Sequence, residues 1–198
     1  MPRILLTAFE PYLEWPDNSS WLTLIELTRL FDTTGRVVTR RYPVNLEGII
    51  ERLSEDLSLG FDYAIHLGQS PGSPVIKLET TGLNALASGL PIIADGPTSF
   101  RSGLPLEAWA QRLVSEGIPA TVSHYAGNYR CNATLFLSHY IAESKGLVTQ
   151  SCFIHLPLAP QQAARHLPHP QPLASMGLTM MAGAVAVLLG DLLQRDFA

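Results

Sequence analysis

Short apolar runs alternate with segments of helical spacing along almost the whole chain. The apolar runs cover residues 4–9, 36–42, 63–67, 75–81, 120–125 and 149–156. Helical spacing marks residues 19–31, 46–59, 106–116, 131–140 and 173–195. Continuous apolar runs are typical of strands in a parallel sheet, and intervening helices cover both faces of such a sheet. We therefore predict one α/β domain over residues 1–198, a three-layer sandwich with a mostly parallel, twisted central sheet.

Two segments have a more specific prediction. The run at residues 36–42 sets Val37, Val38 and Thr39 between basic residues, which is typical of a strand near an edge of the sheet. The Gly- and Pro-rich stretch from 82 to 103 is predicted to be a long irregular insertion. Loops of that length inside a compact domain usually carry function.

Composition excludes several classes of function. Hydrophobic residues make up 46% of the 198 residues and charged residues 15%, so the chain can build a core and has little tendency to disorder. A net charge of −4 with scattered Lys and Arg argues against a nucleic-acid partner. No segment has the pattern of a signal peptide, and the longest apolar span, residues 178–189, is shorter than the roughly 20 residues of a membrane helix. We expect a cytoplasmic protein without a membrane partner.

The predicted fold indicates where a ligand should bind. In layered α/β folds, ligands lie beyond the carboxyl ends of the strands. Four segments occupy such places: residues 9–13, residues 68–72, the turn before Cys131, and residues 155–160. Candidate functional residues are therefore sought there first.

The two cysteines differ in their surroundings. Two are too few for a disulfide framework or a four-ligand zinc site. Cys131 follows a turn at the predicted start of a helix, where backbone N–H groups and the helix dipole stabilise a thiolate. From position alone, a nucleophile and a small buried residue are equally good interpretations. Cys152 lies inside an apolar strand and is predicted to be a core residue.

His155 and Glu79 are candidates for a base and its partner. His155 closes the strand at 149–156, at a carboxyl end where a base for a thiol is expected. Glu79 lies in a largely neutral segment and could hold an imidazole in one tautomer, although such a carboxylate more often faces solvent. His166 and His169 have the spacing of loop metal ligands, but no third ligand is evident and we expect no metal. None of these residues identifies a chemistry by itself.

Several segments, taken in chain order, share the pattern of one family. Cys131 and His155 are separated by 24 residues, and they lie in Ala126-Gly-Asn-Tyr-Arg-Cys-Asn132 and Phe153-Ile-His-Leu-Pro-Leu-Ala-Pro-Gln-Gln162. Earlier segments are Leu5-Leu-Thr-Ala-Phe-Glu-Pro-Tyr12, Asn18-Ser-Ser, His66-Leu-Gly-Gln-Ser-Pro-Gly72 and Leu78-Glu-Thr-Thr-Gly-Leu-Asn84. Together they resemble the pyroglutamyl peptidase I family of cysteine peptidases. Its corresponding patterns are Ala-Gly-Thr-Tyr-Val-Cys-Asn, Phe-Ile-His-Val-Pro-x-x-Pro-Glu-Gln, Thr-Gly-Phe-Glu-Pro-Phe, Asn-Pro-Ser, Val-Gly-Gln-Ala-Gly-Gly and Ile-Glu-Arg-x-Ala-x-Asn.

The resemblance implies a reaction and its catalytic residues. It implies removal of an N-terminal pyroglutamyl residue from peptides through a thioester, with no metal or organic cofactor. Cys131 would be the nucleophile, His155 the base, and Glu79 the group that orients the histidine. The backbone N–H of Cys131 is the natural donor to the oxyanion.

The resemblance also leads to expectations about the substrate and the assembly. Gln69 and its neighbours are candidates for a second donor, and Phe9 and Tyr12 for the walls of an apolar slot that takes the uncharged lactam. For Tyr12, simple core packing remains the other interpretation. The family also suggests a homo-oligomer, either a dimer or a tetramer.

Several positions depart from the family pattern, among them Tyr12, where the family usually has Phe. Ala8 and Leu13 stand where the family has glycines, and Thr80 and Gly89 stand where it has arginines. A divergent homologue that binds a peptide N-terminus or a small ligand without efficient turnover is therefore the alternative function. A nucleoside-binding enzyme that holds phosphate at residues 68–72 is a weaker third interpretation, because that loop lacks the P-loop Lys-Ser/Thr and the dinucleotide glycines.

Overall fold

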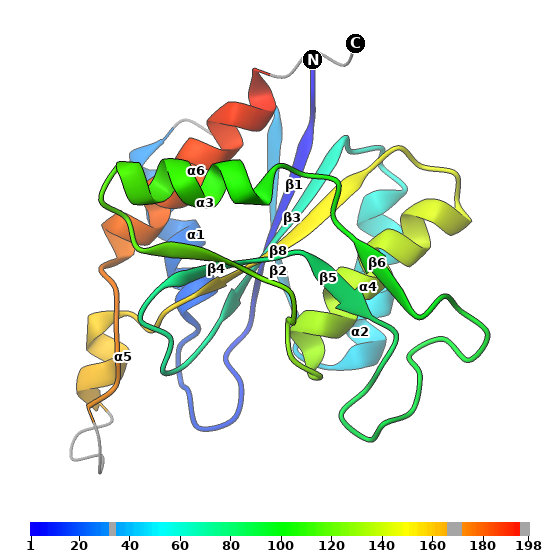
Figure 1. Ribbon diagram of the computed structural model, residues 1–198, viewed down its shortest axis with the longest axis horizontal. Coiled ribbons are helices and arrows are strands. Elements are labelled where there is room, and N and C mark those ends of the chain that lie inside the picture. Colours follow the sequence, from blue (N-terminus) through cyan, green and yellow to red (C-terminus); the bar gives the residue numbers. More distant parts are fainter. Residues whose placement is uncertain (32–34, 166–171, 195–198) are drawn as a thin grey trace.

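The computed structural model describes residues 1–31, 35–165 and 172–194, and it shows the layered α/β arrangement predicted above (Figure 1). Its central sheet has six strands in the order β2-β1-β3-β8-β4-β7. Their bounds are β1 (Ile4–Phe9), β2 (Val37–Tyr42), β3 (Tyr63–Gln69), β4 (Ile76–Glu79), β7 (Ala120–Ser123) and β8 (Gln150–Leu156). The strand at 36–42 is an edge strand, as its basic residues indicate.

Helices pack on both faces of the sheet (Figure 1). One face carries α1 (Ser19–Leu30), α3 (Leu106–Ser115) and α6 (Leu178–Leu193), and the other carries α2 (Leu46–Leu57) and α4 (Arg130–Ser144). Each face has its own cluster of buried side chains, which includes Trp109 on the first and Phe136 on the second. Asn18 caps α1 by accepting a hydrogen bond from the Ser20 N–H.

The mostly parallel sheet contains one reversed pair. Strands β2, β1, β3 and β8 are parallel, whereas β4 runs antiparallel to β8, and β7 is parallel to β4. In the β4–β8 register, Glu79 pairs with Phe153 and Lys77 pairs with His155. Glu79 is thereby a diagonal neighbour of His155 on the same face of the sheet.

The segment between residues 75 and 103 is more ordered than the sequence indicates. The predicted strand at 75–81 ends at Glu79, and the insertion contains β5 (Thr81–Leu83) and β6 (Ser99–Arg101), which form a second, antiparallel sheet. Gly82 brings this sheet against α4, because a Cβ there would lie 2.5 Å from the backbone nitrogen of Phe136. The expectation of a wholly irregular insertion was therefore wrong.

The C-terminal part of the chain differs from the prediction in two places. A short helix, α5 (Pro160–Arg165), follows β8, and α6 begins at Leu178 rather than at 173. The segment before α6 is extended because the Met176 N–H donates to the Leu158 carbonyl. His166 and His169 lie outside the described residues. Within the described ranges, every helix is too short or too polar to cross a bilayer.

Candidate active site

Cys131 is the second residue of α4, and its thiol faces the central sheet. The first N–H groups of a helix have no partner within it, and the side chain of Tyr129, the N-cap of α4, makes no hydrogen bond to them. A Cβ built on Gly68 of β3 would lie 3.4 Å from the Cys131 sulfur and 2.5 Å from the Phe153 ring. A glycine at this point therefore allows the thiol and the ring to approach the strand closely.

His155 and Glu79 form a buried pair next to this thiol. The Nδ1–H of His155 donates to Glu79 Oε1 at 2.8 Å, and the two side chains are 11% and 1% exposed. The antiparallel pairing of β4 and β8 creates this contact. With Nδ1 bound to the carboxylate, Nε2 is the ring nitrogen that remains for proton transfer.

The surroundings of His155 favour its protonated form. Burial lowers its pKa, but the interactions with Cys131 and with the Glu79 carboxylate outweigh burial and raise the pKa to about 9. An imidazolium next to a thiolate is the resting state of an activated cysteine nucleophile. The geometry and the charges of these three residues therefore suit acyl transfer.

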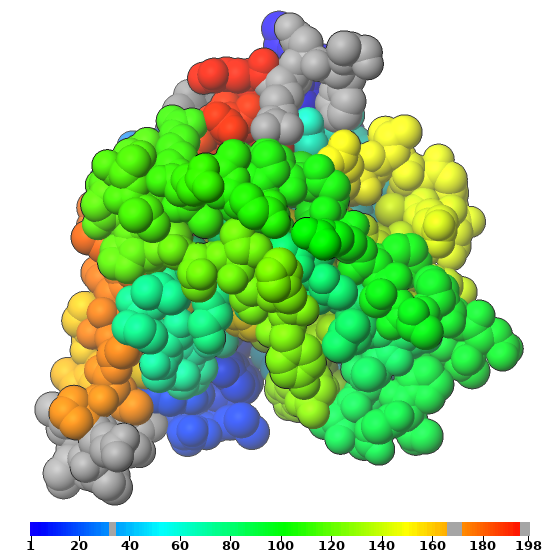
Figure 2. Space-filling view, in the orientation of Figure 1, coloured from blue at the N-terminus to red at the C-terminus, as the bar shows by residue number. Residues whose placement is uncertain are grey.

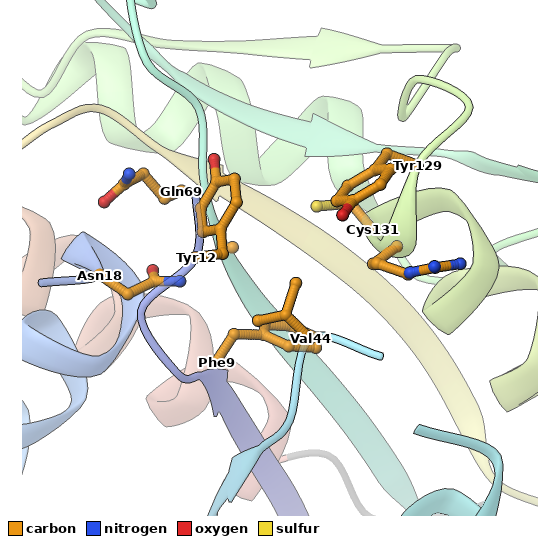
Figure 3. Close-up of a pocket in the computed structure, with 9 residues that line it drawn as sticks. Phe9, Tyr12, Asn18, Val44, Gln69, Tyr129 and Cys131 are labelled. Atoms are coloured by element: carbon orange, nitrogen blue, oxygen red, sulfur yellow. The ribbon is translucent and has the colours of Figure 1, made fainter. Parts of the chain in front are cut away.

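A cavity beside Cys131 brings together the predicted substrate-binding residues. Phe9, Tyr12 and Gln69 line it with Cys131, in about 330 Å³ of empty space that includes its open mouth. Figure 3 shows the Tyr12 ring between Gln69 on one side and Cys131 with Tyr129 on the other. In Figure 2 the surface is hollowed between the blue turn after β1 and the yellow-green segment before α4.

Five further residues line the same cavity and were not singled out as binding residues. They are Asn18, Val44, Gly68, Tyr129 and Arg130. They come from the start of α1, the connection between β2 and α2, the end of β3 and the start of α4. Three of these four segments contain motifs of the family pattern, so a systematic reading of those motifs could have found every residue except Val44.

The amide of Gln69 has a fixed orientation. Its Oε1 accepts hydrogen bonds from the Ser19 N–H and from Gln162 Nε2, both at 2.7 Å. Its Nε2 is buried and has no hydrogen-bond partner within the described residues. Because a buried donor without a partner is costly, this nitrogen is available to donate to a ligand oxygen that reaches it.

Tyr12 lies in a tight turn after β1. Burial, and then the charge of Cys131, raise the pKa of Tyr12 to about 12, so its hydroxyl keeps its proton at neutral pH. The Trp15 N–H donates to the Tyr12 carbonyl, and Leu13 between them has φ 51° with 78% of its surface exposed. Because Leu13 is not a glycine, its positive φ carries backbone strain, at a position where the family pattern has glycine.

Leu13→Gly is expected to stabilise the fold by about 0.5–1 kcal/mol, because removal of the strain outweighs the extra freedom of glycine in the unfolded chain. Urea unfolding would measure this change. Leu90 is similarly exposed but has no positive φ, so Leu90→Gly should lower stability or leave it unchanged. An equal loss of stability in both variants would contradict the assignment of strain to Leu13.

The two positions that lack the family arginines have other roles here. Thr80 is buried, and its hydroxyl lies 2.9 Å from His124 Nδ1 and 3.0 Å from the Thr81 hydroxyl. Gly89 lies in an exposed turn at φ 82°, where other residues would be strained. Glu79 Oε2 is buried without a hydrogen-bond partner within the described residues.

Comparisons with known proteins agree with this geometry. A family model of pyroglutamyl peptidases matches residues 2–191. The pyrrolidone-carboxylate peptidase of Brevibacillus brevis is 31% identical over 209 residues, and pyrrolidone-carboxylate peptidase 1 of Ralstonia nicotianae is 34% identical over 213. Each alignment covers 99% of this chain and 95% of the relative.

Solved structures give the same result. The crystal structure of the pyrrolidone carboxyl peptidase from Fervidobacterium islandicum AW-1 matches with a TM-score of 0.90 at 30% identity, over 98% of this chain and 99% of that one. A structure of the Pyrococcus furiosus pyrrolidone carboxyl peptidase matches with a TM-score of 0.88 at 31% identity, over 97% and 98% of the two chains. With family motif, fold and full-length alignments in agreement, the chain belongs to the pyroglutamyl peptidase family.

Proposed function

We propose that this chain hydrolyses the peptide bond after an N-terminal pyroglutamyl residue, with Cys131 as nucleophile, His155 as general acid and base, and Glu79 as the residue that orients His155. The observation that carries the proposal is the position of the His155 ring. It donates to Glu79 through Nδ1 at 2.8 Å and interacts with Cys131, and both interactions favour the protonated imidazolium.

The first half of the reaction forms an acyl-enzyme. The Cys131 thiolate attacks the scissile carbonyl carbon, a C–S bond forms, and the negative charge moves to the carbonyl oxygen. The Cys131 backbone N–H, at the start of α4, donates to that oxyanion. His155 then gives its proton to the leaving amine, the C–N bond breaks, and a thioester remains.

The second half regenerates the enzyme. The neutral His155 takes a proton from a water molecule that attacks the thioester carbonyl. Collapse of this second tetrahedral intermediate breaks the C–S bond and releases pyroglutamic acid. Throughout both halves, the Glu79 carboxylate stabilises the imidazolium and keeps Nε2 directed toward the reacting atoms.

The cavity suits an uncharged five-membered ring. Phe9 is 4% exposed and stacks on Phe153 with ring centroids 6.1 Å apart, so the apolar wall is fixed. The unpartnered Nε2 of Gln69 is the donor that we assign to the lactam carbonyl. Tyr12 closes the cavity opposite Cys131. An apolar slot with one oriented donor is typical of a small-molecule site.

The alternative is a homologue that binds peptide ends without efficient turnover. Thr80 and Gly89, which replace the family arginines, are the observation that favours it. The Glu79–His155 pair favours the peptidase. Burial of the Glu79 carboxylate, which is 1% exposed, carries a desolvation cost, and catalysis gives a reason to retain it that peptide binding alone does not.

We further propose that the enzyme works in the cytoplasm as a homo-oligomer of two or four chains. Both cysteines are free, and a thiol nucleophile requires reducing surroundings. Partly exposed apolar side chains on α6, among them Ala186 and Val187, support an interface on that helix.

The proposal is tested with three fluorogenic amides that share one leaving group and carry a pyroglutamyl, prolyl or glutaminyl acyl group. The purified full-length chain, kept reduced, should release the fluorophore from the pyroglutamyl amide with a kcat/KM about 100-fold or more above the other two. The prolyl ring lacks the carbonyl that Gln69 would bind, and the glutaminyl group lacks the ring. No release by folded protein would favour the binding homologue, and equal release of the prolyl amide would refute the proposed cavity contacts.

A further inference from the structure

Arg130, the residue before Cys131, lines the cavity and has a guanidinium nitrogen without a partner among the residues described. Its Nε is buried and has no hydrogen-bond partner within the described residues. The guanidinium carbon lies 5.1 Å from the centre of the Tyr129 ring, so a cation–π contact holds the head group in place. This arginine is therefore positioned in advance and still has hydrogen-bonding capacity to offer.

Within the part of the chain that the structure describes, no carboxylate lines the cavity to pair with Arg130. The residues that line it with Arg130 are all uncharged apart from the Cys131 thiol, and the ion pairs among the described residues do not include Arg130. The first turn of α4 has no acidic residue, so the helix dipole adds to the positive potential. An acceptor with a negative charge is the ligand group that matches this environment.

The pyroglutamyl group itself does not require this donor. It has two oxygens, and the proposed function already assigns a donor to each: the Cys131 N–H to the scissile carbonyl and Gln69 Nε2 to the lactam carbonyl. Arg130 is a third donor and the charged one. Arg130 is therefore available to another part of the substrate.

The position of Tyr129 indicates which part of the substrate lies near Arg130. Phe9 and Gln69 are each 4% exposed and form the enclosed end of the cavity, whereas Tyr129 is 44% exposed and lies at its open side. The acyl ring occupies the enclosed end, and the leaving peptide must extend through the open side. The guanidinium that stacks on Tyr129 is thus adjacent to the path of the leaving peptide.

We propose that Arg130 makes the enzyme select substrates with a carboxylate on the residue that directly follows the pyroglutamyl group. The carboxylate is either the α-carboxylate of a dipeptide or the side chain of Asp or Glu, and a guanidinium binds both in the same way. The inference rests on the proposed function, because it needs the acyl ring to occupy the enclosed end of the cavity.

The test uses two pairs of substrates that differ in one charge. Pyroglutamyl-alanine and its amide test the α-carboxylate, and the amides of pyroglutamyl-aspartate and pyroglutamyl-asparagine test the side chain. Release of the second residue gives kcat/KM for each. Wild type should prefer the acidic member of at least one pair by about tenfold, with the difference in KM, and added salt should reduce that preference. The pair that shows the preference identifies the source of the carboxylate.

Variants assign the preference to Arg130. Arg130→Met keeps most of the apolar stem and should lower the acid-to-neutral ratio below about 3, whereas Arg130→Lys keeps a charge without the planar fork and should give an intermediate ratio. Arg101→Met removes the same charge from an exposed residue of β6 that pairs with Glu107, and it should keep the wild-type ratio. Thermal unfolding would verify that each variant is folded.

Three results would overturn the proposal. The first is no acid preference in wild type, and the second is a preference that survives in Arg130→Met. The third is an equal loss of kcat/KM in Arg130→Met on both members of a pair, which would mean that Arg130 acts on the pyroglutamyl group they share. Turnover of the neutral amides separates this inference from the proposed function. If wild type hydrolyses them without an acid preference, only the role of Arg130 is refuted, and if it hydrolyses no pyroglutamyl substrate, both proposals are.

Discussion

Cys131→Ala is expected to lower kcat/KM on the pyroglutamyl amide by on the order of 10⁴-fold or more, because it removes the atom that forms the thioester. The thiol lines the cavity and interacts with His155, so no other step of the proposed reaction can begin without it. Fluorophore release by matched concentrations of folded wild type and variant would measure the loss.

Cys152→Ala is the matched control for this prediction. Cys152 lies in β8 with no exposed surface, and burial raises the pKa of its thiol far above the usual range, so it is not a nucleophile at neutral pH. The variant should keep its activity per folded molecule and lose about 1 kcal/mol of stability from the small cavity. Iodoacetamide should label Cys131 and spare Cys152. Full activity in Cys131→Ala, or equal inactivation of both variants, would refute the assignment of the nucleophile.

Much of the fold could be predicted because its largest elements depend on local pattern. The continuous apolar runs of β3 and β8 are buried along their length, and Asn18 caps α1 as its side chain suggests. The direction of β4 could not be predicted, because an apolar pattern is the same in a parallel and an antiparallel strand. The three-residue strands β5 and β6 and the six-residue helix α5 are too short for any periodicity to emerge.

The site, like the fold, was predictable where it depends on local pattern and not where it depends on tertiary contacts. Cys131 and His155 stand in recognisable motifs, and the structure brings both together with Glu79, Phe9 and Tyr12. What the sequence could not provide is the effect of tertiary contacts on single atoms. The free Nε2 of Gln69 results from hydrogen bonds to Ser19 and Gln162, which are 50 and 93 residues away along the chain. The burial of Arg130 Nε likewise depends on how neighbouring segments pack around the start of α4.

The antiparallel direction of β4 places Glu79 against His155, and the variant Glu79→Gln tests what that contact contributes to catalysis. Glutamine has the same shape without the negative charge, so the fold should persist while the imidazolium loses its partner. We expect kcat/KM to fall by on the order of 10²–10⁴-fold, the range seen when the orienting carboxylate of a catalytic triad is removed. Glu107→Gln removes an equal charge from an exposed residue of α3 and should have no effect.

The pH profile separates this role from a general loss of structure. His155 must be protonated to donate to the leaving amine, and its pKa is raised to about 9, so wild-type kcat/KM should fall as the pH rises through about 9. The Glu79 carboxylate contributes to that rise. In Glu79→Gln the alkaline limb should therefore move to lower pH, and an unchanged limb would contradict the role of Glu79.

Combining the two substitutions tests whether the three residues act as one unit. In wild type, Glu79 acts only through His155, and His155 acts only on groups bonded to, or attacked by, Cys131. Once Cys131 is alanine, loss of the Glu79 charge should have almost no further effect on residual hydrolysis, although each single variant is strongly impaired. Multiplicative losses in the double variant would mean that Glu79 supports catalysis by a route that bypasses the thiolate, and the proposed division of roles would then be wrong.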